Sequence, residues 1–113
     1  GHVNNAVYAT YLEQARAEYY REVLDVSLTA VDTVLVHLSI DYRAPIELGD
    51  GVEVALEVSD LGRSSVTMAY EVYAGDGVAA TAESVQVAWD REAGTSMPLP
   101  EEWRRAIEAY EGL

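Results

Sequence analysis

The sequence predicts an α+β domain in which an antiparallel sheet wraps around one long central helix and a short C-terminal helix follows. Three observations predict it: a helical apolar pattern over residues 5–24, four later segments with period-two alternation, and hairpin-type turn signals between the later strands. Such short connections favour antiparallel pairing. With 113 residues, we expect a single domain, residues 1–113.

The first predicted element is a helix over residues 5–24. Its apolar side chains recur every three or four residues and form a broad aromatic face, as a helix packed against a sheet requires. They are Tyr8, Tyr11, Leu12, Ala15, Tyr19 and Val23. Asn4 or Asn5 can cap the first amides. Two pairs of opposite charge, each three residues apart, can support the helix weakly: Glu13 with Arg16, and Glu18 with Arg21.

Four strands follow, over residues 34–43, 52–59, 66–72 and about 78–89. In the first strand, alternation predicts one face made of Val34, Val36, Leu38, Ile40 and Tyr42. The last strand places Val85, Val87 and Trp89 on one face. Pro98 and Pro100 introduce a helix over residues 101–110. Its expected inward side chains are Trp103, Ala106, Ile107 and Tyr110.

The composition excludes several kinds of function. The net charge is −13, all seven basic residues are arginine, and cysteine is absent. An acidic surface disfavours nucleic acid and anionic membranes as partners. The chain contains no cysteine for a disulfide, a thiol nucleophile or a cysteine metal site, and no metal site is expected. Strong acidity without lysine also suggests a halophile's protein, which goes beyond the general link between charge and solubility. We expect a cytoplasmic location, since no secretory signal pattern is present in the sequence.

One stretch is more specific than the rest. The run Gly1-His-Val-Asn-Asn-Ala-x-Tyr, followed by Tyr11-Leu-Glu-x-Ala-Arg16, resembles the loop-to-helix entry of the hotdog-fold thioesterases, the group typified by 4-hydroxybenzoyl-CoA thioesterase. Residues 40–50, 61–66 and 85–100 are similar to later parts of that family. The resemblance covers essentially the whole chain. It implies a hotdog fold whose first strand is missing from this sequence, and a substrate that is an acyl-CoA or acyl-carrier thioester.

The resemblance also implies catalytic positions. In the family, an aspartate three residues before the glycine supplies the carboxylate, and nothing precedes Gly1 in this sequence. The oxyanion donor would be the backbone N–H of Asn5 at the helix N-terminus, with Gly1 allowing close approach. Plant acyl-ACP thioesterases place a matching histidine in the active site, so His2 is a candidate for proton transfer; the alternative is a hydrogen bond that fixes the loop. Glu13 is a candidate base, as in some hotdog enzymes, or a structural partner of Arg16.

Substrate-binding positions follow the same resemblance. In the 4-hydroxybenzoyl-CoA relative, basic residues at the positions of Arg63 and Ser64 contact CoA phosphates, and Ser64 here replaces a lysine. Arginine suits phosphate because it donates two parallel hydrogen bonds. The alternative is a turn arginine paired with a carboxylate. The other expected substrate-binding residues are Asn4, Tyr8, Tyr11, Leu12 and Ser65.

Two functions stay open. One is an acyl-CoA thioesterase that needs no cofactor beyond the CoA of its substrate. The other is a non-catalytic domain that binds acyl-CoA or an acyl carrier. A hotdog dehydratase is disfavoured, because it needs a different arrangement of His and Glu or Asp. By resemblance, the chain is expected to form a homodimer or homotetramer with the site between subunits.

Overall fold

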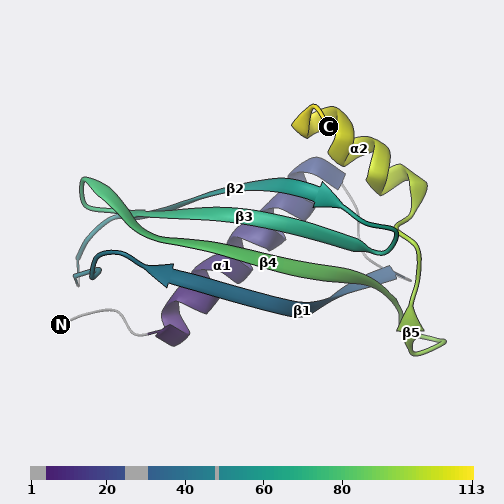
Figure 1. Cartoon of the computed structure of the whole chain (residues 1–113), viewed down its shortest axis with the longest axis horizontal. Coiled ribbons are helices and arrows are strands. Elements are labelled where there is room, and N and C mark those ends of the chain that lie inside the picture. The colour runs from purple at the N-terminus through teal and green to yellow at the C-terminus, as the bar shows by residue number, and fades with distance from the viewer. Residues whose placement is uncertain (1–4, 25–30, 48) are drawn as a thin grey trace.

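A computed structural model describes residues 5–24, 31–47 and 49–113, with side chains omitted at positions 5, 6 and 31 (Figure 1). The elements, in chain order, are α1 (Asn5–Tyr19), a π-helix η1 (Tyr20–Leu24), β1 (Val31–Tyr42), β2 (Val52–Leu61), β3 (Ser65–Ala74), β4 (Gly77–Asp90), β5 (Thr95–Ser96) and α2 (Glu101–Glu111). The predicted α+β class is confirmed, as are the long helix, the four long strands and the closing helix.

The four long strands form an antiparallel sheet in the order β1-β4-β3-β2, and the short β5 pairs with the end of β4. α1 runs diagonally across one face of this sheet (Figure 1). α2 packs beside η1 and β2 at one end. Within the described residues, β1 and β2 are therefore the two edges of the sheet.

The hydrophobic core lies between α1 and the sheet face that it crosses. β3 contributes its alternate residues, which are almost completely buried: Val66, Met68, Tyr70 and Val72. From α1, Tyr8, Leu12 and Tyr19 are buried against them, as the helical period predicts. Each such large apolar side chain contributes roughly 1.5–3 kcal/mol on burial. This packing fixes the orientation of α1 on the sheet.

The prediction of one continuous face along β1 is wrong, because a β-bulge interrupts the strand. The pairing shifts between Leu35 and His37, so that Val36 is the extra residue. Directly opposed residues share a face. Thr33 therefore faces α1 with Ala88, and Leu35 faces it with Gln86, while Val34 turns to the other side with Val87.

The face of β4 that meets α1 is partly polar. Ser84, Gln86 and Ala88 are buried below α1, on the same sheet face as the buried residues of β3. Val85, Val87 and Trp89 do share a face, as predicted, but it is the face that points away from the helix, and they are only half-buried. Two polar side chains thus occupy the centre of the inner sheet face.

Both helices also differ in detail from the prediction. α1 ends at Tyr19, and the following turn is a π-helix that brings Tyr20 into the core at 8% exposure. In α2, Trp103 and Ile107 point inward as predicted, whereas Tyr110 is 62% exposed, and its ring meets that of Tyr19 edge to face. α2 has 11 residues, and its buried residues lie in its first two turns. The last turn therefore lies at the rim of the core.

Candidate active site

The proposed oxyanion donor lies at the start of α1. Asn5 is the first residue of this helix, and no acidic side chain occurs in its first turn. The positive end of the helix dipole is therefore not neutralised within that turn, which favours a negative charge placed there. Gly1, His2 and Asn4 lie outside the described residues, so the roles expected for them stay predictions.

The residues expected to line the acyl site form part of the helix–sheet core. Tyr8 and Leu12 are buried, and Tyr11 is half-buried. Tyr8 meets the exposed Tyr42 of β1 edge to face, with ring centroids 4.9 Å apart. These contacts hold the first two turns of α1 in place. A direct role in substrate binding stays a prediction for all three residues.

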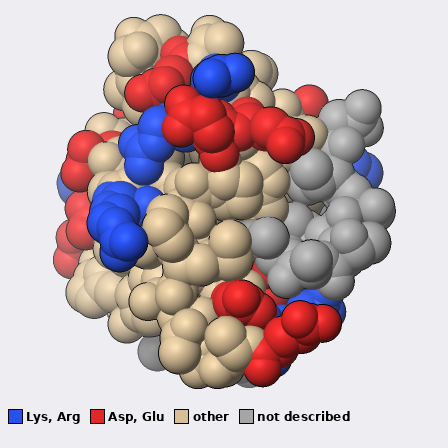
Figure 2. Space-filling view, turned by 90° about the vertical axis from the view of Figure 1, so that its right-hand side faces the viewer, with Lys and Arg blue, Asp and Glu red and all other residues tan. Residues whose placement is uncertain are grey.

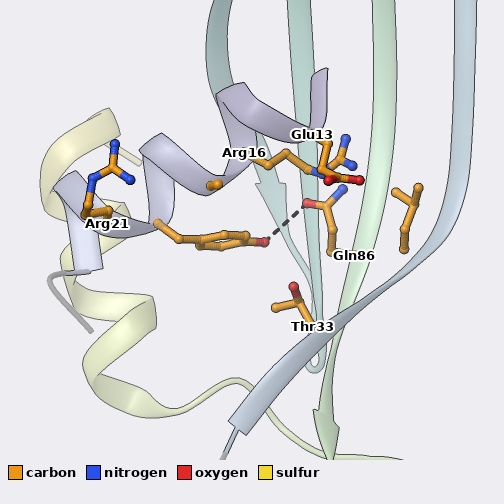
Figure 3. Close-up of a pocket in the computed structure, with 8 residues that line it drawn as sticks. Glu13, Arg16, Arg21, Thr33 and Gln86 are labelled. Atoms are coloured by element: carbon orange, nitrogen blue, oxygen red, sulfur yellow. Dashed lines mark hydrogen bonds between the residues drawn. The ribbon is translucent and has the colours of Figure 1, made fainter. Parts of the chain in front are cut away.

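A pocket of about 450 Å³ opens between the second half of α1, η1, β1 and β4 (Figure 3). Eight residues line it: Glu13, Arg16, Ala17, Tyr20, Arg21, Thr33, Leu35 and Gln86. In Figure 3, Arg16 and Gln86 approach each other across this space, and Arg21 points away from them.

The floor of the pocket is a chain of hydrogen bonds between buried side chains. Tyr20 donates to Oε1 of Gln86 at 3.3 Å, and Nε2 of Gln86 donates to the hydroxyl of Ser84. Ser84 in turn bonds the hydroxyl of Tyr70, which accepts Nη1 of Arg16 at 3.2 Å. A consistent assignment has Ser84 donating to Tyr70, and Tyr70 donating to the sulfur of Met68 at 3.7 Å.

This chain satisfies the polar groups that burial would otherwise penalise. Among the described residues, no buried side-chain nitrogen or oxygen lacks a partner. Burial raises the pKa of the Tyr20 hydroxyl, against an opposing effect of the neighbouring Thr33. Tyr20 therefore stays protonated at neutral pH and remains a donor to Gln86. The chain fixes the C-terminal half of α1 and η1 on β3 and β4.

Glu13 lies on the wall of this pocket and is exposed. Eight residues of helix separate it from Asn5, which is about 12 Å along the axis at 1.5 Å per residue. Groups that act on one carbonyl must approach it to about 3 Å. Within one chain, Glu13 and the Asn5 amide cannot both contact the same carbonyl, so a catalytic role for Glu13 stays a prediction that requires a second subunit. The expected ion pair of Glu13 with Arg16 is not found among the described residues, and Arg16 donates to the Tyr70 hydroxyl instead.

The second predicted site is at the turn between β2 and β3, where Arg63 and Ser64 lie in the turn and Ser65 is the first residue of β3. Arg63 is exposed, and its guanidinium forms no ion pair within the part of the chain that the structure describes. The alternative role of Arg63, as the partner of a neighbouring carboxylate, therefore has no support. The turn lies at the opposite end of the sheet from the β3–β4 hairpin (Figure 1). Contact with phosphate stays a prediction for these residues.

Sequence reasoning missed the buried polar residues Tyr20, Ser84 and Gln86, and also Arg104, which contacts the β2–β3 turn. Alternation showed two faces of β4 but could not tell which one the helix covers. The burial of Tyr20 could not be predicted, because a regular helix would turn this residue away from the stripe of Tyr8, Leu12 and Tyr19.

The first 81 residues match the family model described as the thioesterase superfamily, and this match contains both α1 and the β2–β3 turn. The chain belongs to this superfamily. It is also 31% identical, over 67 residues, to a 1,4-dihydroxy-2-naphthoyl-CoA hydrolase of Synechococcus elongatus; the alignment covers 59% of this chain and 49% of the relative. The chain thus spans about half the length of the curated relatives that it matches.

Solved structures of the superfamily show the same fold. A thioesterase from Thermus thermophilus, complexed with coenzyme A and Zn, is 40% identical and superimposes with a TM-score of 0.85, covering 100% of this chain and 84% of the other. A predicted thioesterase from Bacillus stearothermophilus is 25% identical with a TM-score of 0.86, covering 96% and 83%. The hotdog fold expected from the opening residues is therefore confirmed.

Two further properties concern the described part of the chain only. No group of three or more His, Asp or Glu side chains in it is arranged to hold a metal ion. None of its helices is long and apolar enough to cross a membrane.

Proposed function

We propose that this superfamily member is an acyl-CoA thioesterase that hydrolyses a thioester to a carboxylic acid and CoA. The observation that carries the proposal is the start of α1 at Asn5, inside the family match, with no carboxylate in its first turn. The amide of Asn5 would donate a hydrogen bond to the carbonyl oxygen as negative charge develops there. The similar hydrolase of Synechococcus and the thioesterase that binds coenzyme A support a CoA thioester as the substrate.

The reaction is a substitution at the carbonyl carbon. A water oxygen bonds to that carbon, the C–S bond breaks, and CoA leaves as a thiolate that takes up a proton. Activation of the water needs a base. By resemblance to the family, the aspartate three residues before the glycine would supply the carboxylate, either as this base or as a nucleophile in place of water. His2 is the second candidate for the proton transfer.

The test replaces the backbone donor without breaking the helix. Proline is tolerated at the first helical position and has no N–H. In the full-length natural protein, Asn5→Pro should lower kcat by about 10²- to 10³-fold with little change in KM, because the donor acts mainly in the transition state. Asn5→Ala keeps the amide and should stay within a few fold of the unchanged protein. Equal activity of the two variants on a panel of acyl-CoAs would contradict the proposed donor.

The second candidate function is a domain that binds acyl-CoA or an acyl carrier without hydrolysis. It is favoured by the first turn of α1, which holds no acidic side chain that could act as a base beside the Asn5 amide. The two candidates differ in one measurement. A binding domain would retain CoA affinity but would release no thiol from any acyl-CoA in the panel.

The proposal includes a homodimer or homotetramer. β1 is an edge strand, and three neighbouring apolar side chains on it are exposed: Val34 at 38%, Leu35 at 43% and Val36 at 59%. Exposed apolar edges of this kind favour pairing with another strand. The pocket between α1 and β1 opens beside that edge, so a second subunit would contribute to its wall.

A cytoplasmic location and adaptation to salt complete the proposal. The net charge of −13 with no lysine supports the second point. The free energy of unfolding, measured by urea titration, should rise between millimolar and molar KCl, because salt screens repulsion between carboxylates. A fall in stability over that range would end the salt-adaptation hypothesis.

A further inference from the structure

We infer that Arg104, on the C-terminal helix α2, is a positioning residue for the β2–β3 turn and supplies the second positive charge of its phosphate site. This inference rests on the proposed function, because the phosphates are those of CoA. By resemblance, Ser64 stands where a relative has a lysine. The turn itself therefore carries one cation, Arg63, where that relative has two.

All three carbonyl groups of the turn are bonded to the rest of the protein. Nη2 of Arg104 donates to the carbonyl of Gly62 at 2.7 Å. The amide of Leu99 donates to the carbonyl of Arg63 at 2.9 Å, and the amide of Ala88 donates to that of Ser64 at 2.8 Å. The negative ends of these three peptide groups are thereby directed toward the protein.

The hydrogen-bond donors of the turn are left available. Within the described residues, the amides of Arg63 and Ser64 donate no backbone hydrogen bond, and the Arg63 guanidinium has no ion-pair partner. Successive free amides next to a guanidinium form a site that favours an anion. A phosphate accepts from both kinds of donor.

The charge of Arg104 is also uncompensated. Its only side-chain partner among the residues that the structure covers is the neutral carbonyl of Gly62. The adjacent Arg105 differs, because its Nε lies 3.5 Å from Glu101. Figure 2 views this end of the molecule, where basic side chains gather next to carboxylates. Within the described residues, neither Arg63 nor Arg104 forms an ion pair, although the whole chain has a net charge of −13.

Arg104 thus has two effects at this turn. Its hydrogen bond to Gly62 orients the residue next to Arg63, and its positive charge lies against the same backbone. Arg104 is half-buried, and charges partly removed from water are screened less. This position strengthens the attraction between Arg104 and a phosphate bound at the turn. A CoA phosphate bound at the turn would be attracted by the positive charges of both Arg63 and Arg104. The C-terminal helix in this way replaces the cation that Ser64 lacks.

The test measures binding of CoA and of pantetheine, which lacks the phosphates, by isothermal titration calorimetry of the full-length protein. Arg104→Gln should weaken CoA binding roughly tenfold, because it removes a positive charge near the phosphate and the guanidinium that orients the turn. Arg104→Lys should restore CoA binding to within about threefold of the unchanged protein. Arg105→Gln is the matched control, because it removes the same charge one residue away and should leave the affinity for CoA unchanged. Pantetheine binding should be the same in all four proteins.

Three results would contradict the inference. Equal CoA affinity in Arg104→Gln and Arg105→Gln would show that Arg104 has no special role. A parallel loss of CoA and pantetheine binding in Arg104→Gln would indicate a structural effect instead of a phosphate contact. If the unchanged protein binds pantetheine as tightly as CoA, the phosphates are not recognised, and this part of the proposed function fails together with the inference.

Discussion

The hydroxyl of Tyr19 donates a 2.9 Å hydrogen bond to Oε2 of Glu111, 92 positions later in the chain. The same oxygen accepts the amide of Val58 at 2.8 Å. Tyr19 is the last residue of α1, Glu111 is the last residue of α2, and Val58 lies next to a bulge in the edge strand β2. One carboxylate therefore joins the long helix, the closing helix and the sheet.

Removing that carboxylate should destabilise the fold. Glu111→Ala leaves the Tyr19 hydroxyl and the Val58 amide without their acceptor, and hydrogen bonds to charged groups contribute about 1.5–3 kcal/mol each when well formed. Because Glu111 is partly exposed, we expect a loss of about 2 kcal/mol in the free energy of unfolding, measured by urea titration. Glu108→Ala makes the same change one turn earlier and should cost less than about 1 kcal/mol. Similar losses in both variants would refute the role of Glu111.

Stability should decline at alkaline pH. Burial, and then the hydrogen bond to Glu111, raise the pKa of Tyr19, and burial raises the pKa of Tyr20. Both hydroxyls hold their protons more tightly in the folded chain than in the unfolded chain, where the pKa is near 10. The contribution of these two protonated hydroxyls to the free energy of unfolding is complete below about pH 10 and falls as the pH rises above it. Urea titrations between about pH 8 and 11 should show this fall, and Tyr19→Phe should reduce its slope. A flat profile above about pH 10 would contradict the assignment.

The buried chain at Gln86 should behave as a unit. Gln86→Leu leaves the Tyr20 hydroxyl with an unmet donor and should cost about 2–3 kcal/mol in the free energy of unfolding. Tyr20→Phe removes that donor, so the double variant should be less destabilised than the sum of the two single variants. A double-mutant cycle should give a coupling energy of about 1 kcal/mol. Simple additivity would show that the two side chains do not interact.

The β1 edge should control self-association. Val36→Glu places a charge on the exposed bulge and should shift the protein toward the monomer in sedimentation velocity, because a buried charge at a strand pair is costly. Leu113→Glu is the control, since Leu113 is 58% exposed and lies at the C-terminus, outside the sheet. If Val36→Glu leaves the sedimentation coefficient unchanged, the interface lies elsewhere.

The regular parts of the fold followed from periodicity, and the irregular parts did not. The stripe of Tyr8, Leu12 and Tyr19 predicted the buried face of α1 because consecutive helical turns repeat. The bulge at Val36 adds one residue between two apolar neighbours, and alternation within Val-Leu-Val cannot show where pairing shifts. The π-helix at Tyr20 also could not be predicted, because the regular helical period does not show where a turn widens.

The candidate site could be predicted only in part. The resemblance of short sequence motifs to those of the thioesterase superfamily pointed to the amide of Asn5 and to the turn at Arg63. The partners of a side chain from distant segments cannot be read in this way. The contact of Arg104 with Gly62 spans 42 positions, and that of Tyr20 with Gln86 spans 66. Both depend on how α1 and α2 settle on the sheet.

The bulge in β1 also determines which changes in length this strand tolerates. Deleting Val36 would join Leu35 to His37 with the ordinary alternation, so that Thr33 and Leu35 would still face the helix. Deleting His37 instead would give the same register, with Val36 in place of His37 opposite Val85. The pocket wall is thus insensitive to losing either of these two residues, and that shortening would turn a kinked edge into a straight one that pairs more readily with a second strand.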